Sequence, residues 1–402
     1  MTSKMRDTLK PYAIVVLATL AIVLIYLKCY GTGDSLFISI DLDKPVDRFI
    51  SRLIQESEAG DQFSFSICDY NIQNAVVFFL CKITGNIYQG VNAYYILSFF
   101  LISISTFWYL QKMNVSIGMA VFGAVMASLV PFHIDRGEGQ IVTSTFFMVP
   151  MFCGLWYDII YEAKVKNIKK ISVISMCIAP FIDLRLSVMA GILMVILAAH
   201  RRKKEIIRTT IIFLIPLISA TFLLNHVTSA LHTDNLEQGM ELAREEGMRI
   251  IDMIMPLRYH VWDRLWNLRY EYDVAFSANG ESGLNSMGII LTSFLMISMI
   301  ILFFNIDIDE RISWIAWVDI LVVLIANVSG FNLLFEYIGI HVGYWNRMAI
   351  FIIIQTIAVM GILADRLRER MRSKVHVSII NSIYLLIGLI GIAELLLRQN
   401  ML

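Results

Sequence analysis

The sequence predicts an all-α integral membrane protein of about ten to eleven transmembrane segments, because apolar runs long enough to span follow one another along most of the chain. Hydrophobic residues occupy 57% of the 402 positions and charged residues only 16%, and the mean hydropathy is +0.68. These values are too apolar for a soluble globular protein. The formal net charge is zero, so overall charge gives no reason to expect nucleic-acid binding. We expect residues 1–402 to form a single membrane domain.

The distribution of Lys and Arg predicts which side of the membrane each loop faces, because basic residues beside short loops remain in the cytoplasm. The first span, 12–30, follows a basic start and is expected to be retained. Its apolar run exceeds that of a cleavable signal peptide, and no small-residue cleavage site follows it. The N-terminus is therefore predicted to be cytoplasmic. Basic clusters at 4–10, 164–170, 201–208 and 366–374 mark the same side.

The first outer segment, 31–89, is expected to contain two interfacial helices. Apolar residues in Pro45–Ile54 recur at helical spacing and predict an amphipathic helix lying on the outer leaflet. Asn74–Ile83 is apolar but too short to span, so we expect a second interfacial piece there. Cys29 and Cys68 could form a disulfide on this side.

The segment 171–199 is unusual because it carries Pro180, Asp183 and Arg185 in its middle and basic clusters beyond both ends. If both ends are cytoplasmic, the segment must be a helical hairpin whose turn reaches the outer side. One long kinked span is the alternative. Broken helices at membrane depth usually line a cavity, so the hairpin would contribute to a site.

A second large outer segment, 226–285, is predicted from its polar composition. We expect a charged amphipathic helix over 236–253 and a stretch dense in aromatic and basic residues over 256–272. The remaining spans are predicted at 91–110, 116–129, 141–160, 207–224, 286–304, 314–338, 348–364 and 376–397.

Phe132 to Gln140 forms a charged loop between two apolar runs, and neither spanning nor lipid packing explains its charges. The guanidinium of Arg136 or the imidazole of His133 suits a phosphate, and Glu138 suits sugar hydroxyls or a catalytic role. An Arg136–Glu138 ion pair that closes the loop is the structural alternative.

Acidic residues follow the first span closely. Asp34 lies after Gly31 and Gly33 near the hydrocarbon edge, where desolvation would raise its pKa toward that of a general base. Asp41 and Asp43 follow it and could be solvated surface residues, as could Asp69 later in the segment.

Two further cationic sets stand at outer loops. One set lies in the predicted outer loop just before the span at 348–364 and comprises Tyr344, Asn346 and Arg347. Arg347 there suits a phosphate or serves as an interfacial anchor. Arg258 and His260 are interleaved with aromatic residues that could stack on a sugar or rest on lipid headgroups.

Taken in order, these short motifs resemble a group of bacterial multispan proteins of the GT-C glycosyltransferase superfamily. The most specific parts are the RGEG and WNR motifs. By size and architecture the chain is also similar to the serotype-converting O-antigen glucosyltransferases of temperate phages. The series comprises Gly33-Asp34, Asp69, Pro131-Phe132-His133, Arg136-Gly137-Glu138-Gly139, Gly280-Glu281-Ser282-Gly283 and Trp345-Asn346-Arg347.

The resemblance implies a donor of the polyprenyl (undecaprenyl) phosphate-sugar type, with glucose as the first candidate. The acceptor would be a polysaccharide such as lipopolysaccharide O-antigen, and the active site would face the periplasm from the bacterial inner membrane. Asp34 would be the base that activates the acceptor and Glu138 a second catalytic carboxylate. Arg136 and Arg347 would bind the donor phosphate. Other candidates are His133, Arg258 and His260 for phosphate, and Asp69, Tyr344, Asn346, Glu281, Asp183 and Arg185 for substrate.

Many related enzymes also bind a divalent metal, Mg²⁺ or Mn²⁺, through paired outer-loop acids. Asp41 and Asp43 could supply such a pair here, and no other cofactor is expected. A transporter or flippase of lipid-linked sugars is the main alternative, because a charged cavity among many spans also suits translocation. A lipid-binding or assembly protein without chemistry is a second alternative. The sequence has no apparent internal repeat and no glycine-rich phosphate loop, which favours one-sided catalysis with a lipid-linked donor.

Overall fold

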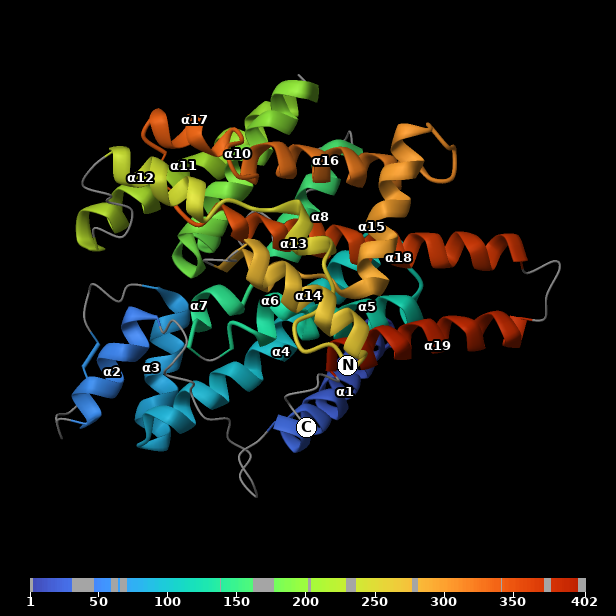
Figure 1. The fold of residues 1–402 in the computed structure, drawn as a ribbon, viewed down its shortest axis with the longest axis horizontal. Coiled ribbons are helices and arrows are strands. Elements are labelled where there is room, and N and C mark those ends of the chain that lie inside the picture. The colour runs from blue at the N-terminus through green and yellow to red at the C-terminus, as the bar shows by residue number, and fades with distance from the viewer. Residues whose placement is uncertain are drawn as a thin grey trace.

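The computed structural model describes residues 3–30, 47–58, 64–65, 71–137, 139–161, 177–201, 204–228, 236–276, 281–340, 342–371 and 377–396. Every regular element in these ranges is a helix (Figure 1). Met248 and Asn327 form an isolated parallel bridge. The all-α prediction is therefore confirmed for this part of the chain.

Four helical stretches among the described residues are long and apolar enough to cross a membrane, which supports the prediction of a membrane protein. The first lies in α1 (Ser3–Tyr30) and the second is α4 (Ile87–Lys112). The third joins α5 (Ile117–Leu129) to α6 (Pro131–Ile134), and the fourth joins η4 (Trp345–Met348) to α18 (Ala349–Met371). Shorter apolar stretches occur in α3 (Ile72–Thr84), α10 (Leu184–Arg201), α11 (Lys204–Thr228), α15 (Gly288–Phe303) and α19 (Val377–Leu396).

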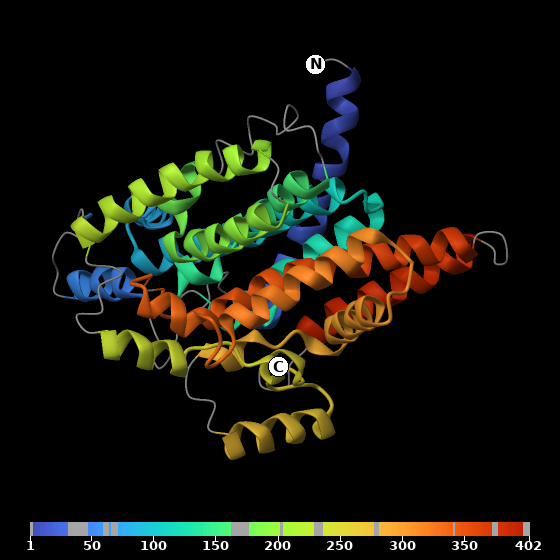
Figure 2. The same ribbon diagram turned by 90° about the horizontal axis from the view of Figure 1, so that it is seen from above.

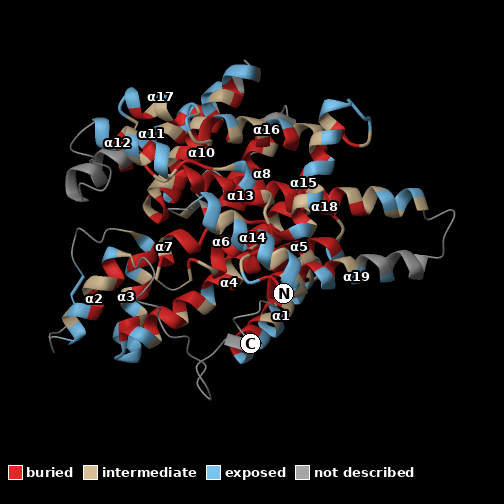
Figure 3. Cartoon of the chain, in the orientation of Figure 1, coloured by how far each residue is buried: buried red, intermediate tan, exposed pale blue. Residues whose placement is uncertain are grey.

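Helix α18 is the centre of the bundle. Nearly every side chain in its first four turns is buried, and it packs on α5, α15, α16 (Glu310–Ala326), α19 and α8 (Met148–Tyr161). The rings of Phe351 on α18 and Trp156 on α8 stack at 5.2 Å. Buried positions concentrate in this middle region (Figure 3). By contrast, Leu17 and Leu24 of α1 are exposed rather than packed against the bundle, as expected for a helix that faces lipid.

The amphipathic helix expected in the first outer segment is present as α2 (Arg48–Glu58), but its apolar face packs inward. Phe49, Ile50, Leu53 and Ile54 are buried within the protein rather than free to lie on a leaflet. The second predicted piece is α3, which packs along α4. The side chain of Asn71 caps α3 by accepting a hydrogen bond from Gln73 N at 2.7 Å.

The stretch predicted as one span, 141–160, is not a continuous helix, because the chain breaks there into α7 (Ile141–Ser144) and α8. A continuous helix would need an N–H at position 150 for the carbonyl of Phe146, and Pro150 has none. Val149 N donates to Phe146 O instead, at 2.9 Å. Pro150 then lies in the first turn of α8, where a missing N–H costs nothing.

Two other predicted helices are also interrupted, and the two breaks touch each other. The stretch 236–253 divides into α12 (Leu236–Glu245) and α13 (Ile250–Ile254), and 314–338 divides into α16 and α17 (Asn332–Tyr337). Met248 N donates to Ala326 O at 2.8 Å, and Val328 N donates to Met248 O at 3.0 Å. A Cβ at Gly247 would meet Val328 Cα at 2.8 Å, so the close approach requires glycine.

The segment 171–199 is helical over 177–182, breaks at Asp183 and continues as α10. Residues 162–176 lie outside the described ranges, so the predicted hairpin as a whole remains a prediction. Seen from above, α14 (Asp263–Phe276) stands away from the bundle (Figure 2). Its exposed side chains include Tyr270, Val274 and Phe276.

Candidate functional site

The buried carboxylate of Glu336 fixes the loop that leads into η4. Its Oε1 accepts hydrogen bonds from Val342 N, Gly343 N and Trp345 Nε1 at 3.0 to 3.1 Å. Gly343 has a φ of +78°, which other residues rarely adopt. The WNR motif therefore enters the bundle in one fixed orientation, with Arg347 buried at its end.

Arg347 forms a bidentate ion pair with Glu281 on η3 (Glu281–Asn285). Its Nε lies 3.0 Å from Oε2 and its Nη2 lies 2.9 Å from Oε1. Arg136, from the RGEG loop after α6, reaches the same carboxylate, with Nη2 at 3.5 Å from Oε2. The Arg136 guanidinium also lies 3.8 Å from the centre of the Phe132 ring. Three loops far apart in the sequence thus share one carboxylate.

A third arginine joins the cluster through Tyr344. The guanidinium carbons of Arg347 and Arg185 lie 4.4 and 5.1 Å from the centre of the Tyr344 ring, a cation–π geometry. Arg185 lies in the first turn of α10, directly after the break at Asp183. Elements η3, η4 and α10 meet here, since η4 contacts the other two.

Asp47, directly before α2, brings a further segment of the chain into the same cluster. Its N–H donates to Gly139 O of the RGEG loop at 2.6 Å, and its Oδ2 accepts from Val142 N at 3.3 Å. Burial raises the pKa of Asp47 to about 6, although the Val142 hydrogen bond and the charges of Arg347 and Arg185 oppose this shift. A carboxyl group with this pKa can take up a proton near neutral pH.

Asp183 and Glu246 add two further carboxyl groups whose pKa values are raised, in each case chiefly by burial. Asp183 Oδ1 accepts from Leu186 N at 2.9 Å and so caps α10. Glu246 Oε2, at the end of α12, accepts from Asn346 Nδ2 at 2.9 Å and from Glu281 N at 3.2 Å. Glu246 therefore ties η3 to η4.

The ionisation of Glu281 and Arg136 follows from their mutual attraction. Burial by itself would raise the pKa of Glu281, but Arg347 and Arg136 outweigh it and hold the pKa at about 2. Burial lowers the pKa of Arg136 to about 10, which leaves it charged at neutral pH. Guanidinium groups gathered in this way suit an anionic ligand whose phosphate can accept hydrogen bonds from the arginines.

The structure brings together seven of the predicted site residues: Arg136, Arg347, Tyr344, Asn346, Glu281, Asp183 and Arg185. Five predicted residues lie outside the described ranges and remain predictions. They are Asp34, Asp41, Asp43, Asp69 and Glu138.

Three predicted phosphate contacts are not brought into the arginine cluster. His133 is buried between α4 and α5, with Nε2 at 2.7 Å from Ser98 Oγ and Nδ1 at 2.6 Å from Ser128 O, so both ring nitrogens are engaged. Arg258 Nε pairs with Asp273 at 3.0 Å. His260 Nε2 lies 3.7 Å from Glu394 on α19.

Asp47, Glu246 and Asn285 belong to the cluster although the sequence did not single them out. Asn285 Nδ2 donates to Asn346 O at 3.0 Å, and its Oδ1 lies 3.4 Å from Arg136 Nη2. The sequence signal for Asp47 was its place as the third acid of the series Asp41, Asp43 and Asp47. Nothing in the sequence distinguished Glu246 from its acidic neighbour Glu245.

Among the described residues, no group of three or more His, Cys, Asp or Glu side chains could hold a metal ion. The predicted metal pair, Asp41 and Asp43, lies outside those residues. No protein-family model matches the chain, and no curated protein or solved structure is significantly similar to it.

Proposed function

We propose that the protein is a membrane glycosyltransferase that moves a sugar, with glucose as the first candidate, from polyprenyl (undecaprenyl) phosphate to a polysaccharide such as lipopolysaccharide O-antigen. One observation carries this proposal. Arg136, Arg185 and Arg347 come from three separate segments and converge on Glu281 and Tyr344. Buried arginines are costly unless they serve a charged partner, and a phosphate is the partner that guanidinium forks suit best.

The proposed sugar transfer requires few protein side chains. The acceptor hydroxyl oxygen attacks the anomeric carbon of the sugar, and the bond from that carbon to the phosphate oxygen breaks. The departing phosphate keeps the electron pair, and Arg347 and Arg136 would stabilise its charge. A carboxylate takes the hydroxyl proton. Asp47 is the candidate base among the described residues, because it contacts the RGEG loop at Gly139 and burial raises its pKa to about 6, while Asp34 and Glu138 remain the candidates from sequence.

We further propose a GT-C-like topology of about ten to eleven spans, with the N-terminus in the cytoplasm and the arginine cluster facing the periplasm of the bacterial inner membrane. The span Trp345–Met371 supports this orientation. Arg347 lies at its first turn, whereas Arg366, Arg368 and Arg370 lie at its last turns. If the basic end is cytoplasmic, the arginine cluster lies on the opposite side.

The proposal is tested by incubating purified protein in detergent with synthetic polyprenyl-phosphate glucose and with lipopolysaccharide that bears O-antigen. Labelled sugar should enter the polysaccharide with wild type and with the control Arg368→Ala. It should enter at least tenfold more slowly with Arg347→Ala, which corresponds to more than about 1.4 kcal/mol of barrier. Absence of transfer by wild type from glucose, galactose and mannose donors would overturn the proposal. Repeating the assay with EDTA tests whether transfer requires a divalent metal, for which Asp41 and Asp43 are the candidate ligands.

A transporter of lipid-linked sugars is the second candidate, and one observation favours it. Asp319 in α16 is fully buried, and neither of its carboxylate oxygens has a hydrogen-bond partner among the described residues. An unpaired acid inside a membrane bundle is typical of a proton-coupled pathway. Movement of a lipid-linked sugar between the leaflets of proteoliposomes, lost in Asp319→Asn and without any transfer to polysaccharide, would favour this candidate.

A further inference from the structure

A cavity of about 280 Å³ opens among α5, α15, α18 and α19, near the end of α18 that is opposite the arginine cluster. Its lining is almost entirely apolar and includes Met119, Phe294, Met360, Leu363 and Ile387. Arg366 and Arg370 supply the charged part of the lining. The cavity therefore combines an apolar interior with cationic groups at the end of a membrane-spanning helix.

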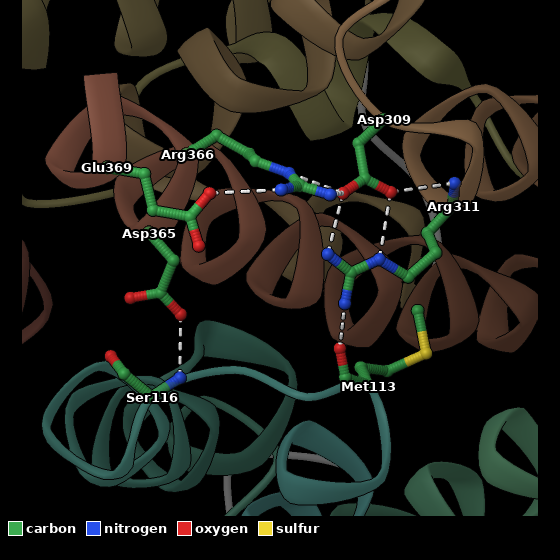
Figure 4. A network of polar contacts seen from close by, with 7 residues as sticks. All are labelled: Met113, Ser116, Asp309, Arg311, Asp365, Arg366 and Glu369. Carbon is green, nitrogen blue, oxygen red and sulfur yellow. Dashed lines mark hydrogen bonds and ion pairs between the residues drawn. The ribbon is translucent and has the colours of Figure 1, made fainter.

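The two arginines of the cavity differ in how they are engaged. Arg366 is held by Asp309, with Nε at 2.9 Å and Nη2 at 2.8 Å from Oδ2, and by Glu369, with Nη1 at 3.0 Å from Oε2 (Figure 4). Arg370 is exposed and forms no hydrogen bond or ion pair with the residues that the structure describes. Arg370 is thus the cation of the cavity that is available to a ligand.

Three acids at this end of α18 are already engaged by groups other than Arg370. Asp309 binds both Arg311 and Arg366 (Figure 4). Asp365 Oδ2 accepts from Ser116 N at 2.6 Å, which joins the start of α5 to α18, and Glu369 binds Arg366. The end of α18 therefore presents an excess positive charge beside an apolar cavity.

We propose that this cavity is a binding site for an anionic phospholipid, with an acyl chain in the apolar cavity and the headgroup phosphate at Arg370. Basic pockets between transmembrane helices are the expected recognition elements for such lipids. A peptide would leave most of its backbone N–H and C=O groups unpaired against this apolar lining. The site is distinct from the arginine cluster at Arg347, so the proposal does not depend on the glycosyltransferase activity.

The test is native mass spectrometry of the detergent-purified full chain, titrated with phosphatidylglycerol and with phosphatidylcholine of the same acyl chains. Wild type should bind phosphatidylglycerol more tightly. Arg370→Gln should weaken that binding about fivefold, the value expected for one arginine near an anionic headgroup. Arg368→Gln removes the same charge from the same helix but does not line the cavity, so it should leave the affinity unchanged.

A second variant tests the cavity itself. Leu363→Trp fills it with an indole and should reduce binding of both lipids, while the melting temperature in detergent shows that the variant remains folded. Equal affinity of wild type for the two lipids would overturn the proposal. So would equal losses in Arg370→Gln and Arg368→Gln, which indicate a diffuse basic surface, or unchanged binding in folded Leu363→Trp.

Discussion

Glu281 accepts two hydrogen bonds from Arg347, at 3.0 and 2.9 Å, across a separation of 66 positions in the sequence. The pair joins η3 to the first turn of the span Trp345–Met371. Its geometry is the fork that a guanidinium group also offers to a phosphate. A donor phosphate would therefore share or displace this internal carboxylate.

Removing the carboxylate should destabilise the fold at neutral pH. Glu281→Gln leaves Arg347 and Arg136 without a counter-charge in a buried site, which we expect to cost about 3 kcal/mol. The pKa of Glu281 is depressed from 4.5 to about 2, so the stabilisation is fully present above pH 4.5 and is lost as the pH falls toward about 2.

Thermal unfolding in detergent between pH 7 and pH 3 measures this effect. The gap between wild type and Glu281→Gln should be large at pH 7 and shrink below pH 4.5. Glu369→Gln is the control, because Glu369 is an exposed partner of Arg366 and surface pairs contribute little. A gap that does not change with pH would show that Glu281 acts by packing alone.

Asp47 gives the proposed reaction a pH dependence. Its pKa is raised to about 6, so the fraction of Asp47 able to accept a proton rises as the pH passes upward through 6. The rate of sugar transfer should therefore increase between pH 5 and pH 7 in wild type. Asp47→Asn should slow transfer at least tenfold. If this variant keeps the wild-type rate and pH profile, Asp47 is not the base and Asp34 becomes the stronger candidate.

Glu336 is expected to act as a positioning residue for Arg347. Its Oε1 accepts hydrogen bonds from two backbone N–H groups on the loop before η4 and from the indole of Trp345 at the start of η4. Glu336→Ala leaves these donors without their acceptor and should raise the KM for the donor lipid several-fold. Glu336→Gln retains a carbonyl oxygen and should restore most of the affinity. Equal KM values for both variants and wild type, measured at matched thermal stability, would count against this role.

The contact between α3 and α4 depends on a glycine. A Cβ at Gly90 would lie 2.5 Å from Cys81 Cα and N, which are backbone atoms that cannot move aside. Gly90→Ala should therefore lower the melting temperature. Gly118→Ala on α5 meets no atom within 4 Å and should be neutral or slightly stabilising, as helical glycine replacements usually are. Similar melting temperatures for the two variants would contradict this packing.

Much of the helical content was predictable because apolar length and periodicity determine it. The apolar face of α2, with Phe49 and Leu53, was identified from helical spacing alone. What the sequence did not predict was where that face packs, since an amphipathic pattern is the same for a helix on lipid and for one on protein. The break before Pro150 was missed for a different reason, because hydropathy averages across a proline.

The arginines of the candidate site could be predicted from the sequence more fully than its carboxylates. Arg136 and Arg347 stand out in sequence because charges at a membrane boundary are rare and costly. Asp47 and Glu246 follow other acids in polar stretches of the sequence, and their place in the cluster depends on long-range packing. The surroundings of His133 were not predictable either, because its position in a charged loop does not indicate that Ser98 and the Ser128 carbonyl engage both ring nitrogens.

The central claim is that the arginine cluster holds the phosphate of a polyprenyl lipid, and equilibrium binding of polyprenyl phosphate to the purified protein tests it most directly. Wild type and Arg368→Ala should bind with the same affinity, and Arg347→Ala at least tenfold more weakly, or about 1.4 kcal/mol. Equal affinities for all three proteins would contradict the assignment of the cluster as the phosphate site.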